Sequence, residues 1–212
     1  GDIYQGQFYD GQMHGFGQLS FSNGDRYEGV FVAGKREGRG LLIFSNGHRY
    51  EGDFSDGQMD GEGVLIFANG DRYEGEFSAG TRHGKGGFMF ANGDTFEGTF
   101  SDGEMHGTGV FTFASGHLYE GDYVGGLWHG KGELTLANGD VYQGDFVEGR
   151  RHGKGLYTFS SGNVYEGSFA DDKMHGEGIF TYSNGDRYVG TFADGLQNGP
   201  GVIHYVDGGR FE

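Results

Sequence analysis

The chain of 212 residues contains no cysteine and one proline. Without cysteine it has no disulfide, no thiol nucleophile and no cysteine-ligated metal, and a cytosolic setting is favoured. Basic residues are also scarce, because 15 Lys and Arg stand against 31 Asp and Glu and leave a net charge of −16. DNA or RNA binding is therefore disfavoured, since phosphate contacts require a cationic surface. No apolar run approaches the roughly 18 residues of a membrane-spanning helix, and the sequence shows no signal peptide.

Glycine, in contrast, is abundant and periodic, with 48 residues. An aromatic residue recurs every 23 residues without insertion or deletion, at Tyr4, Tyr27, Tyr50, Tyr73, Phe96, Tyr119, Tyr142, Tyr165, Tyr188 and then Phe211. A fixed period of this length is typical of stacked-repeat proteins. We predict one repeat array over residues 1–212, with repeats at 4–26, 27–49, 50–72, 73–95, 96–118, 119–141, 142–164, 165–187 and 188–210. Since the chain starts at a Gly just before a repeat and stops just after one, we expect a fragment of a longer protein.

Each repeat carries two strand signals. Tyr27 and Phe31 fall on one face of an extended segment with Gly29 between them, and Leu65 and Phe67 do the same in a second segment. Asn-Gly, the strongest short hairpin signal, follows the second segment in six repeats. Frequent glycine makes helix unfavourable by about 1 kcal/mol per residue relative to Ala. The sequence thus predicts an all-β fold, an elongated single-layer antiparallel sheet or rod of nine hairpins.

The glycines on the aromatic face have a packing role in this prediction. In a sheet with no helices over it, large rings can cover one another only if alternate inward positions are empty. A layer of this kind offers surface, and we expect it to have little depth for a pocket.

The repeat resembles the MORN (membrane occupation and recognition nexus) family, whose unit is of the type YxGxFxxGxxHGxGxLxFxxG. The segment from Tyr73 to Gly93 follows that pattern position by position, through Tyr73-Glu74-Gly75-Glu76-Phe77, Gly80, His83-Gly84-Lys85-Gly86, Phe88, Phe90 and Asn92-Gly93. Such a resemblance identifies a scaffold and not a chemistry. It implies that MORN repeats occur beside catalytic domains, in membrane-tethering proteins, or as nearly whole cytoskeletal proteins of protozoa.

With no foreign segment between repeats, the chain is most similar to the last class, such as the apicomplexan basal-complex scaffold of cell division. The resemblance therefore implies a non-enzymatic, self-associating scaffold that organises a cytoskeletal or membrane-associated complex through protein–protein contacts. The alternative is a phosphoinositide-binding module that targets a longer protein to a membrane. We expect cytoskeletal protein partners, no cofactor and no nucleic acid. The expected location is the cytoplasm, on the cytoskeleton, with the cytoplasmic face of a membrane as a further option.

A histidine recurs in the His-Gly-x-Gly segment of the repeat, at His14, His83, His106, His129, His152 and His175. The same position holds Glu37, Asp60 and Asn198 in the other three repeats. All four residue types have short polar side chains that can hydrogen-bond turn backbone, which indicates a structural role. Neighbouring histidines would lie roughly 9 to 10 Å apart, too far to share one Zn²⁺. A metal site between two chains stays open, and we predict no catalytic residue.

Apolar residues replace the usual polar ones at four outward positions, Leu41, Ile43, Val64 and Ile66. A contiguous exposed aliphatic patch usually marks a contact surface, so these residues form a candidate partner patch. The alternative is that a curved sheet covers them.

The residue before the histidine position alternates, as Met13, Arg36, Met59, Arg82 and Met105. This alternation of Met and Arg indicates either an ancestral two-repeat duplication or a Met/Arg-lined edge that contacts a partner. Basic residues also gather in this region, and the candidate edge for weak binding of anionic lipid comprises Lys35, Arg36, Arg39, Arg150, Arg151 and Lys154. Each basic residue near an anionic membrane contributes about 1 kcal/mol. The acidic remainder of the chain opposes the approach.

The last strand of an open sheet has no neighbour, and proteins cover, charge or pair such edges. Here the closing segment, residues 201–206, is apolar and contains no Lys or Glu. Asp172 also replaces a Gly found in the eight other repeats. We predict a C₂ homodimer through the C-terminal repeats, with the contact at Leu196, Val202, Ile203 and Tyr205. The alternative is that further repeats normally cap this end.

Overall fold

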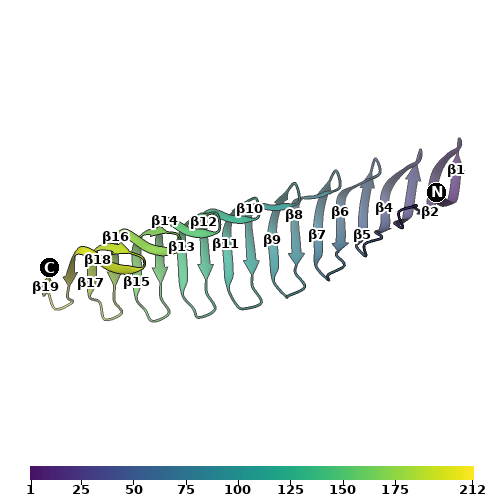
Figure 1. The fold of residues 1–212 in the computed structure, drawn as a ribbon. Helices are drawn as coiled ribbons and strands as arrows, with labels where there is room; N and C mark the ends of the chain where they lie inside the picture. Colours follow the sequence, from purple (N-terminus) through teal and green to yellow (C-terminus); the bar gives the residue numbers. More distant parts are fainter. The chain divides into compact units, whose positions relative to one another are not determined.

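The computed structural model describes residues 1–212 and contains nineteen β-strands and no helix. The strands form one open antiparallel sheet in which each follows its predecessor in chain order (Figure 1), so the prediction of an all-β, single-layer antiparallel fold is confirmed. The chain divides into two compact units, residues 1–105 and 106–212. With no helix at all, the structure offers none that could cross a membrane.

The first unit is built from β1 (Ile3–Tyr9), β2 (Gln12–Ser20), β3 (Arg26–Val32), β4 (Lys35–Ile43), β5 (Arg49–Ser55), β6 (Gln58–Ile66), β7 (Arg72–Ser78), β8 (Thr81–Met89) and β9 (Thr95–Ser101). The second contains most of β10 (Glu104–Thr112) and then β11 (Leu118–Val124), β12 (Leu127–Thr135), β13 (Val141–Val147), β14 (Arg150–Thr158), β15 (Val164–Ala170), β16 (Lys173–Thr181), β17 (Arg187–Ala193), β18 (Leu196–His204) and β19 (Arg210–Phe211).

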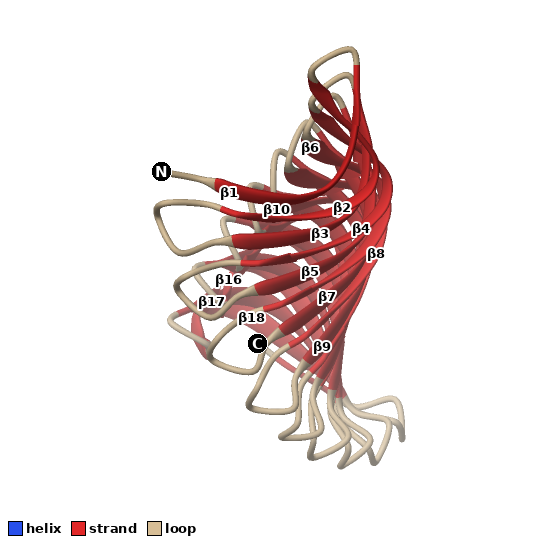
Figure 2. Ribbon diagram, turned by 90° about the vertical axis from the view of Figure 1, so that its right-hand side faces the viewer, coloured by secondary structure: helices blue, strands red, loops and turns tan.

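The two strands of a repeat pair with a recurring register and a recurring irregularity. In β3 and β4, Gly29 pairs with Gly40, and a bulge follows Gly29. Gly40 pairs in turn with Gly52 of β5, so the glycines form a row across the strands. Because a bulge bends its strand and increases the local twist, the strands are strongly curved (Figure 2).

One face of each unit is a layer of aromatic rings. The ring of Tyr27 meets Phe31 of its own repeat edge-on at 5.1 Å and Phe54 of the next repeat at 4.9 Å. It also covers the glycine row, because a Cβ atom added to Gly29 or Gly40 would lie 2.7 or 2.6 Å from its Cζ. These observations confirm the predicted packing role of the face glycines.

The tyrosine hydroxyls are donors within this layer. Tyr27 Oη donates to the carbonyl oxygen of Val30 at 3.1 Å, and burial raises the pKa of Tyr27 to about 12. The hydroxyl therefore stays protonated and holds the bulge carbonyl in place. The same bond recurs from Tyr50, Tyr119 and Tyr142 to the residue three positions on.

A second ladder of hydrogen bonds runs along the Asn-Gly turns. Asp25 Oδ1 accepts the backbone N–H of Ser45, one repeat further on, at 2.8 Å. That bond, more than any other, lowers the pKa of Asp25. His48 and Asn163 occupy the same turn position and accept the equivalent N–H groups at 2.9 Å. Three residue types thus perform one structural task, which is to join consecutive repeats.

Candidate functional site

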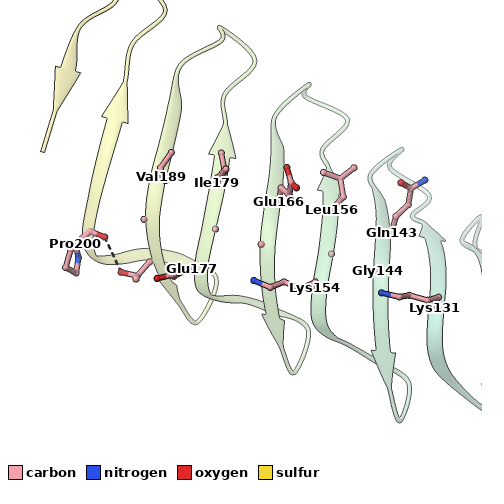
Figure 3. A pocket seen from close by; sticks show the side chains of 15 residues that line it. Lys131, Gln143, Gly144, Lys154, Leu156, Glu166, Glu177, Ile179, Val189 and Pro200 are labelled. Atoms are coloured by element: carbon pink, nitrogen blue, oxygen red, sulfur yellow. Dashed lines mark hydrogen bonds between the residues drawn. The ribbon is translucent and has the colours of Figure 1, made fainter.

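The face opposite the aromatic rings carries a groove of about 1120 Å³ in the second unit. It is lined by Lys131, Gln143, Gly144, Lys154, Gly155, Leu156, Glu166, Gly167, Glu177, Gly178, Ile179, Val189, Gly190, Thr191 and Pro200 (Figure 3). The sequence led us to expect little depth for a pocket, and this expectation was wrong. It overlooked that the bulges bend the strands.

The glycine row is the floor of the groove. Gly144, Gly155, Gly167, Gly178 and Gly190 pair in consecutive registers from β13 to β17. The missing Cβ of each glycine points at the tyrosine rings on the other face, since a Cβ at Gly155 would lie 2.7 Å from Cζ of Tyr142. Because side chains alternate along a strand, the residues on either side of each glycine project toward the groove.

The two walls differ in chemistry. Figure 3 shows Gln143, Leu156, Glu166, Ile179 and Val189 along one wall and Lys131, Lys154, Glu177 and Pro200 along the other. Thr191, which donates to the carbonyl oxygen of Pro200, belongs to the second wall. The groove runs from β12 to β18, which at about 4.8 Å per strand spacing is about 29 Å. That length would accommodate about nine residues of extended chain.

Charge changes sign along the groove. At the β12 end, Lys131 Nζ lies 2.5 Å from Asp145 Oδ1, and this hydrogen bond is the main reason why the pKa of Asp145 is lowered. Lys154 Nζ donates to the neutral hydroxyl of Ser168 at 2.9 Å. Carboxylates follow at Glu166 and Glu177, and the β18 end is apolar.

In four repeats the residue three positions after the tyrosine is acidic and has a structural task that sequence reasoning missed. Asp145 Oδ2 accepts the backbone N–H of Lys154 at 3.0 Å, and Asp122 accepts that of Lys131 at 3.0 Å. In the last repeat the corresponding donor is absent, because Pro200 has no N–H. There the position holds Thr191, which instead donates to the carbonyl oxygens of Asn198 and Pro200. Val30 and Ser168 also occupy this position in repeats that keep the N–H donor, so the sequence carried no clear signal for the bond.

The histidine position lies two residues before the backbone N–H that the acidic residue accepts, as His152 does before Lys154. Where the position is acidic, the predicted bond to turn backbone is confirmed, since Glu37 accepts the N–H of Asp56 at 3.2 Å and Asp60 that of Ala79 at 3.1 Å. No three His, Asp or Glu side chains come together in a way that could hold a metal ion.

The candidate partner patch occupies the open face of the first unit, but it is not continuous. Leu41 and Ile43 lie on β4, Val64 and Ile66 lie on β6, and β5 places Arg49 and Glu51 between the two pairs. Arg49 Nη2 lies 2.7 Å from Glu51 Oε2. Because these paired side chains occupy the space above β5, the hollows here measure only about 290 and 260 Å³.

The candidate lipid edge is not one surface in either unit, because consecutive residues face opposite sides of a strand. Arg36 and Arg151 lie in the aromatic layer, each with Cζ 5.3 Å from a ring centroid, and they donate to the carbonyl oxygens of Gly57 and Asp172. Lys35 and Arg150 extend from the turns to Asp56 and Asp171 of the next repeat, at 2.6 and 3.3 Å. Arg39 and Lys154 line hollows of the open face.

The alternating Met/Arg position is therefore a packing position, at least where it holds a large side chain. Arg82 lies over four rings, and Trp128, at the same position, stacks on Tyr119 at 4.3 Å with an interplanar angle of 9°. The hypothesis of a Met/Arg-lined edge that meets a partner gains no support from Arg36, Arg82 and Arg151, because their guanidinium groups face the rings of their own chain.

The predicted dimer residues fall on different sides of the last hairpin. β18 pairs with β17 along its length but with β19 only through Ile203 and His204. Leu196 and Tyr205 are exposed, at 72% and 42%, whereas Val202 and Ile203 are half-buried. Ile203 pairs with Tyr188 and so belongs to the aromatic face. Nearby, Asp172 takes the left-handed conformation expected of Gly, with φ of 69°, and pairs with Arg151 at 3.2 Å.

Comparisons with known proteins place this geometry in context. No curated protein sequence matches the chain. Among solved structures, the chain is similar to the TCP10 domain of Danio rerio CPAP in complex with a peptide of Danio rerio STIL, at 14% identity and a TM-score of 0.52, over 100% of this chain and 98% of that chain. The wild-type TCP10 domain of Danio rerio CPAP alone gives 16% identity and a TM-score of 0.51 over 91% of each chain.

The family comparison is more specific. The model of the MORN repeat matches nine consecutive segments, residues 4–26, 27–49, 50–72, 73–95, 96–118, 119–141, 142–164, 165–187 and 188–210. Together with the hairpin register and the aromatic layer, this match shows that the chain belongs to the MORN repeat family.

Proposed function

We propose that the chain is a non-enzymatic scaffold that binds partner proteins, and that an extended segment of a partner docks in the groove from β12 to β18. The observation that carries the proposal is a groove of about 1120 Å³ that is lined by side chains from seven adjacent strands. An open groove of this length suits a peptide chain better than a small molecule, which favours enclosed pockets.

A solved structure with a similar fold supports the proposal. The TCP10 domain of Danio rerio CPAP is in complex with a peptide of Danio rerio STIL. Binding of a partner's peptide by an open antiparallel sheet is therefore physically available to this fold. MORN repeats suggest a protein-binding or membrane-binding module, and the dispersed basic residues favour the first of these here.

We further assign the scaffold to the cytoplasm, among self-associating proteins that organise cytoskeletal complexes in cell division, like the basal-complex scaffold of apicomplexans. The support is the run of nine MORN repeats without an intervening segment. Self-association as a C₂ homodimer would present two grooves to partners.

The test is a selection from a displayed library of random peptides of about ten residues, with the full chain as bait. Binding of the selected peptides is then measured by fluorescence anisotropy for wild type and for the double variant Leu156→Asp/Ile179→Asp. The matched control is Leu41→Asp/Val64→Asp, which changes the same repeat positions on the open face of the first unit. We expect the groove variant to bind about tenfold more weakly and the control to bind as wild type does. Peptides that bind all three proteins equally would overturn the proposal.

A further inference from the structure

One of the six Asn-Gly turns differs from the others in how its asparagine side chain is held. In five turns the asparagine Nδ2 donates to an aspartate carboxylate two residues later, at 2.8 to 3.1 Å; these asparagines are Asn23, Asn69, Asn92, Asn138 and Asn184. In the sixth turn His48 replaces that aspartate, and its Nδ1 accepts the N–H of Ala68 at 2.9 Å. The side-chain amide of Asn46 therefore lacks the carboxylate that holds the other five.

The six turns are otherwise alike. Asn46 Oδ1 accepts the N–H of His48 at 3.1 Å, as Asn23 Oδ1 accepts that of Asp25 at 3.0 Å. The glycine that follows has φ between 88° and 95° in all six turns, and its N–H donates to the carbonyl oxygen three residues earlier at 2.9 to 3.0 Å. All six asparagines are exposed. Neither the backbone nor exposure to water distinguishes Asn46, so the difference is the missing bond.

The missing bond matters because an Asn-Gly pair is chemically reactive. The backbone nitrogen of the glycine can attack Cγ of the asparagine, since glycine has no side chain to shield it. A bond forms between that nitrogen and Cγ, the bond from Cγ to Nδ2 breaks, and Nδ2 leaves as ammonia with the glycine N–H proton. Water then opens the cyclic imide at either carbonyl carbon. The product is aspartate or isoaspartate at the asparagine position, with one added negative charge.

Ring closure requires the side-chain amide to turn until Cγ comes within reach of the glycine nitrogen. In the five aspartate turns this rotation breaks two hydrogen bonds of the amide, one from Nδ2 and one to Oδ1. At Asn46 it breaks only the bond to Oδ1. The bond from Nδ2 has a charged acceptor, and such bonds contribute more than neutral ones. The barrier to ring closure is therefore lower at Asn46.

We propose that Asn46-Gly47 is a modification site, the turn that converts to isoaspartate and aspartate ahead of the other five. Isoaspartate takes the main chain through Cβ and Cγ, which lengthens the turn by one atom. Two turn bonds span the altered residue, one from the N–H of Gly47 to Phe44 and one from that of Phe44 to His48. Modification thus loosens the junction between His48 and Ala68 of the next repeat.

The test is peptide mapping of the full chain by mass spectrometry during incubation at neutral pH. Trypsin places the six turns in six different peptides, and Asn198-Gly199, which lies in β18, in a seventh. We expect Asn46 to be modified about tenfold faster than Asn23 or Asn69, the effect of one charge-assisted hydrogen bond on a rate. In concentrated urea, which unfolds the chain, the rates at the six turns should converge. A faster rate at Asn46 that persists in urea would assign it to the local sequence and overturn the proposal.

A substitution in the same turn isolates the bond. His48→Asp supplies the missing carboxylate. It also keeps an acceptor for the next repeat, since Asp71, at the same turn position, accepts the N–H of Ala91 at 2.8 Å. We expect His48→Asp to slow modification of Asn46 to the rate of Asn69, whose Nδ2 has this bond.

The reverse exchange is made one repeat further on. Asp71→His removes the carboxylate there and should raise the rate at Asn69 about tenfold. Circular dichroism establishes that each variant keeps its β fold. Equal rates at Asn46 and Asn69 in the wild-type chain would overturn the proposal, and so would rates that neither exchange changes.

Discussion

Asp140 Oδ1 accepts the backbone N–H of Ser160, which lies one repeat further along the chain, at 2.8 Å. Asp140 Oδ2 accepts the hydroxyl of Tyr157 at 2.8 Å, and only 9% of Asp140 is exposed. The N–H of Ser160, ahead of the other hydrogen bonds, lowers the pKa of Asp140 to about 2. One carboxylate thus joins two repeats through the turn ladder and the aromatic layer.

This bond makes stability depend on pH in a defined direction. Because the pKa of Asp140 is lower in the folded chain than the ordinary 3.8, its contribution is fully present above pH 4 and is lost as the pH falls toward 2. We expect Asp140→Ala to lower the free energy of unfolding by about 1 kcal/mol more at pH 7 than at pH 2.5, after allowance for solvent screening. Urea unfolding at the two pH values measures the difference. The control is Asn163→Ala, which removes the equivalent but uncharged acceptor and should cost the same at both values. An equal cost of Asp140→Ala at both pH values would contradict the assignment.

The glycine row predicts a sharp difference between two glycine substitutions. A Cβ at Gly155 would lie 2.7 Å from Cζ of Tyr142, whereas at Gly87, on the open face, the nearest atom is 3.9 Å away. We expect Gly155→Ala to destabilise the chain by about 2 kcal/mol, since the buried ring must move. Gly87→Ala should change stability by less than about 0.5 kcal/mol. Thermal or urea unfolding gives the free energy of unfolding of each variant. Similar losses for Gly155→Ala and Gly87→Ala would show that packing of the tyrosine rings does not require glycine beneath them.

Lipid binding, if it occurs, is expected to be weak and electrostatic, because the net charge is −16 and the basic residues do not share a surface. Co-sedimentation with phosphoinositide-containing vesicles should fall to background at high salt, where the Debye length is about 3 Å at 1 M. Arg150→Glu, which changes an exposed turn residue, should remove what remains at low salt. Micromolar binding that persists at 1 M salt would require a specific lipid site and favour the membrane-targeting alternative.

Self-association is expected to involve the exposed residues of the last hairpin. Light scattering at micromolar concentration should give the mass of a dimer for the wild-type chain. Leu196→Glu together with Tyr205→Ser should shift the mass toward the monomer, since both side chains are exposed and belong to the segment with the unpaired edge. Ile203 is unsuitable for this test because it faces the aromatic layer. A strictly monomeric wild type would show that the chain does not self-associate. A dimer unaffected by these substitutions would show that the contact lies elsewhere.

The hairpins and the aromatic layer were predictable because they depend on residues close together in the sequence. The spacing of Tyr27, Gly29 and Phe31 assigns all three to one face, and Asn-Gly assigns the turn. The groove was not predictable in this way, because it depends on bulges such as the one after Gly144. The alternation of side chains along the strand does not indicate where a bulge occurs.

The basic edge shows the opposite error. Lys35 and Arg36 are adjacent in the sequence, but one reaches an aspartate of the next turn and the other lies over aromatic rings. Clustering in the sequence predicts a shared surface only when the spacing matches the alternation of the strand. The aliphatic residues Leu41 and Ile43 satisfy that condition, but the charged side chains of the neighbouring strand separate them from Val64 and Ile66.

The most direct test of the docking groove is the amide NMR spectrum of the full chain during titration with a peptide selected from the displayed library. We expect the resonances of the floor glycines to shift as the peptide is added, namely those of Gly144, Gly155, Gly167, Gly178 and Gly190. The equivalent glycines of the first unit, Gly29, Gly40, Gly52 and Gly63, should stay in place. Shifts confined to the first unit or to the turn glycines, with the floor resonances unmoved at saturation, would contradict it.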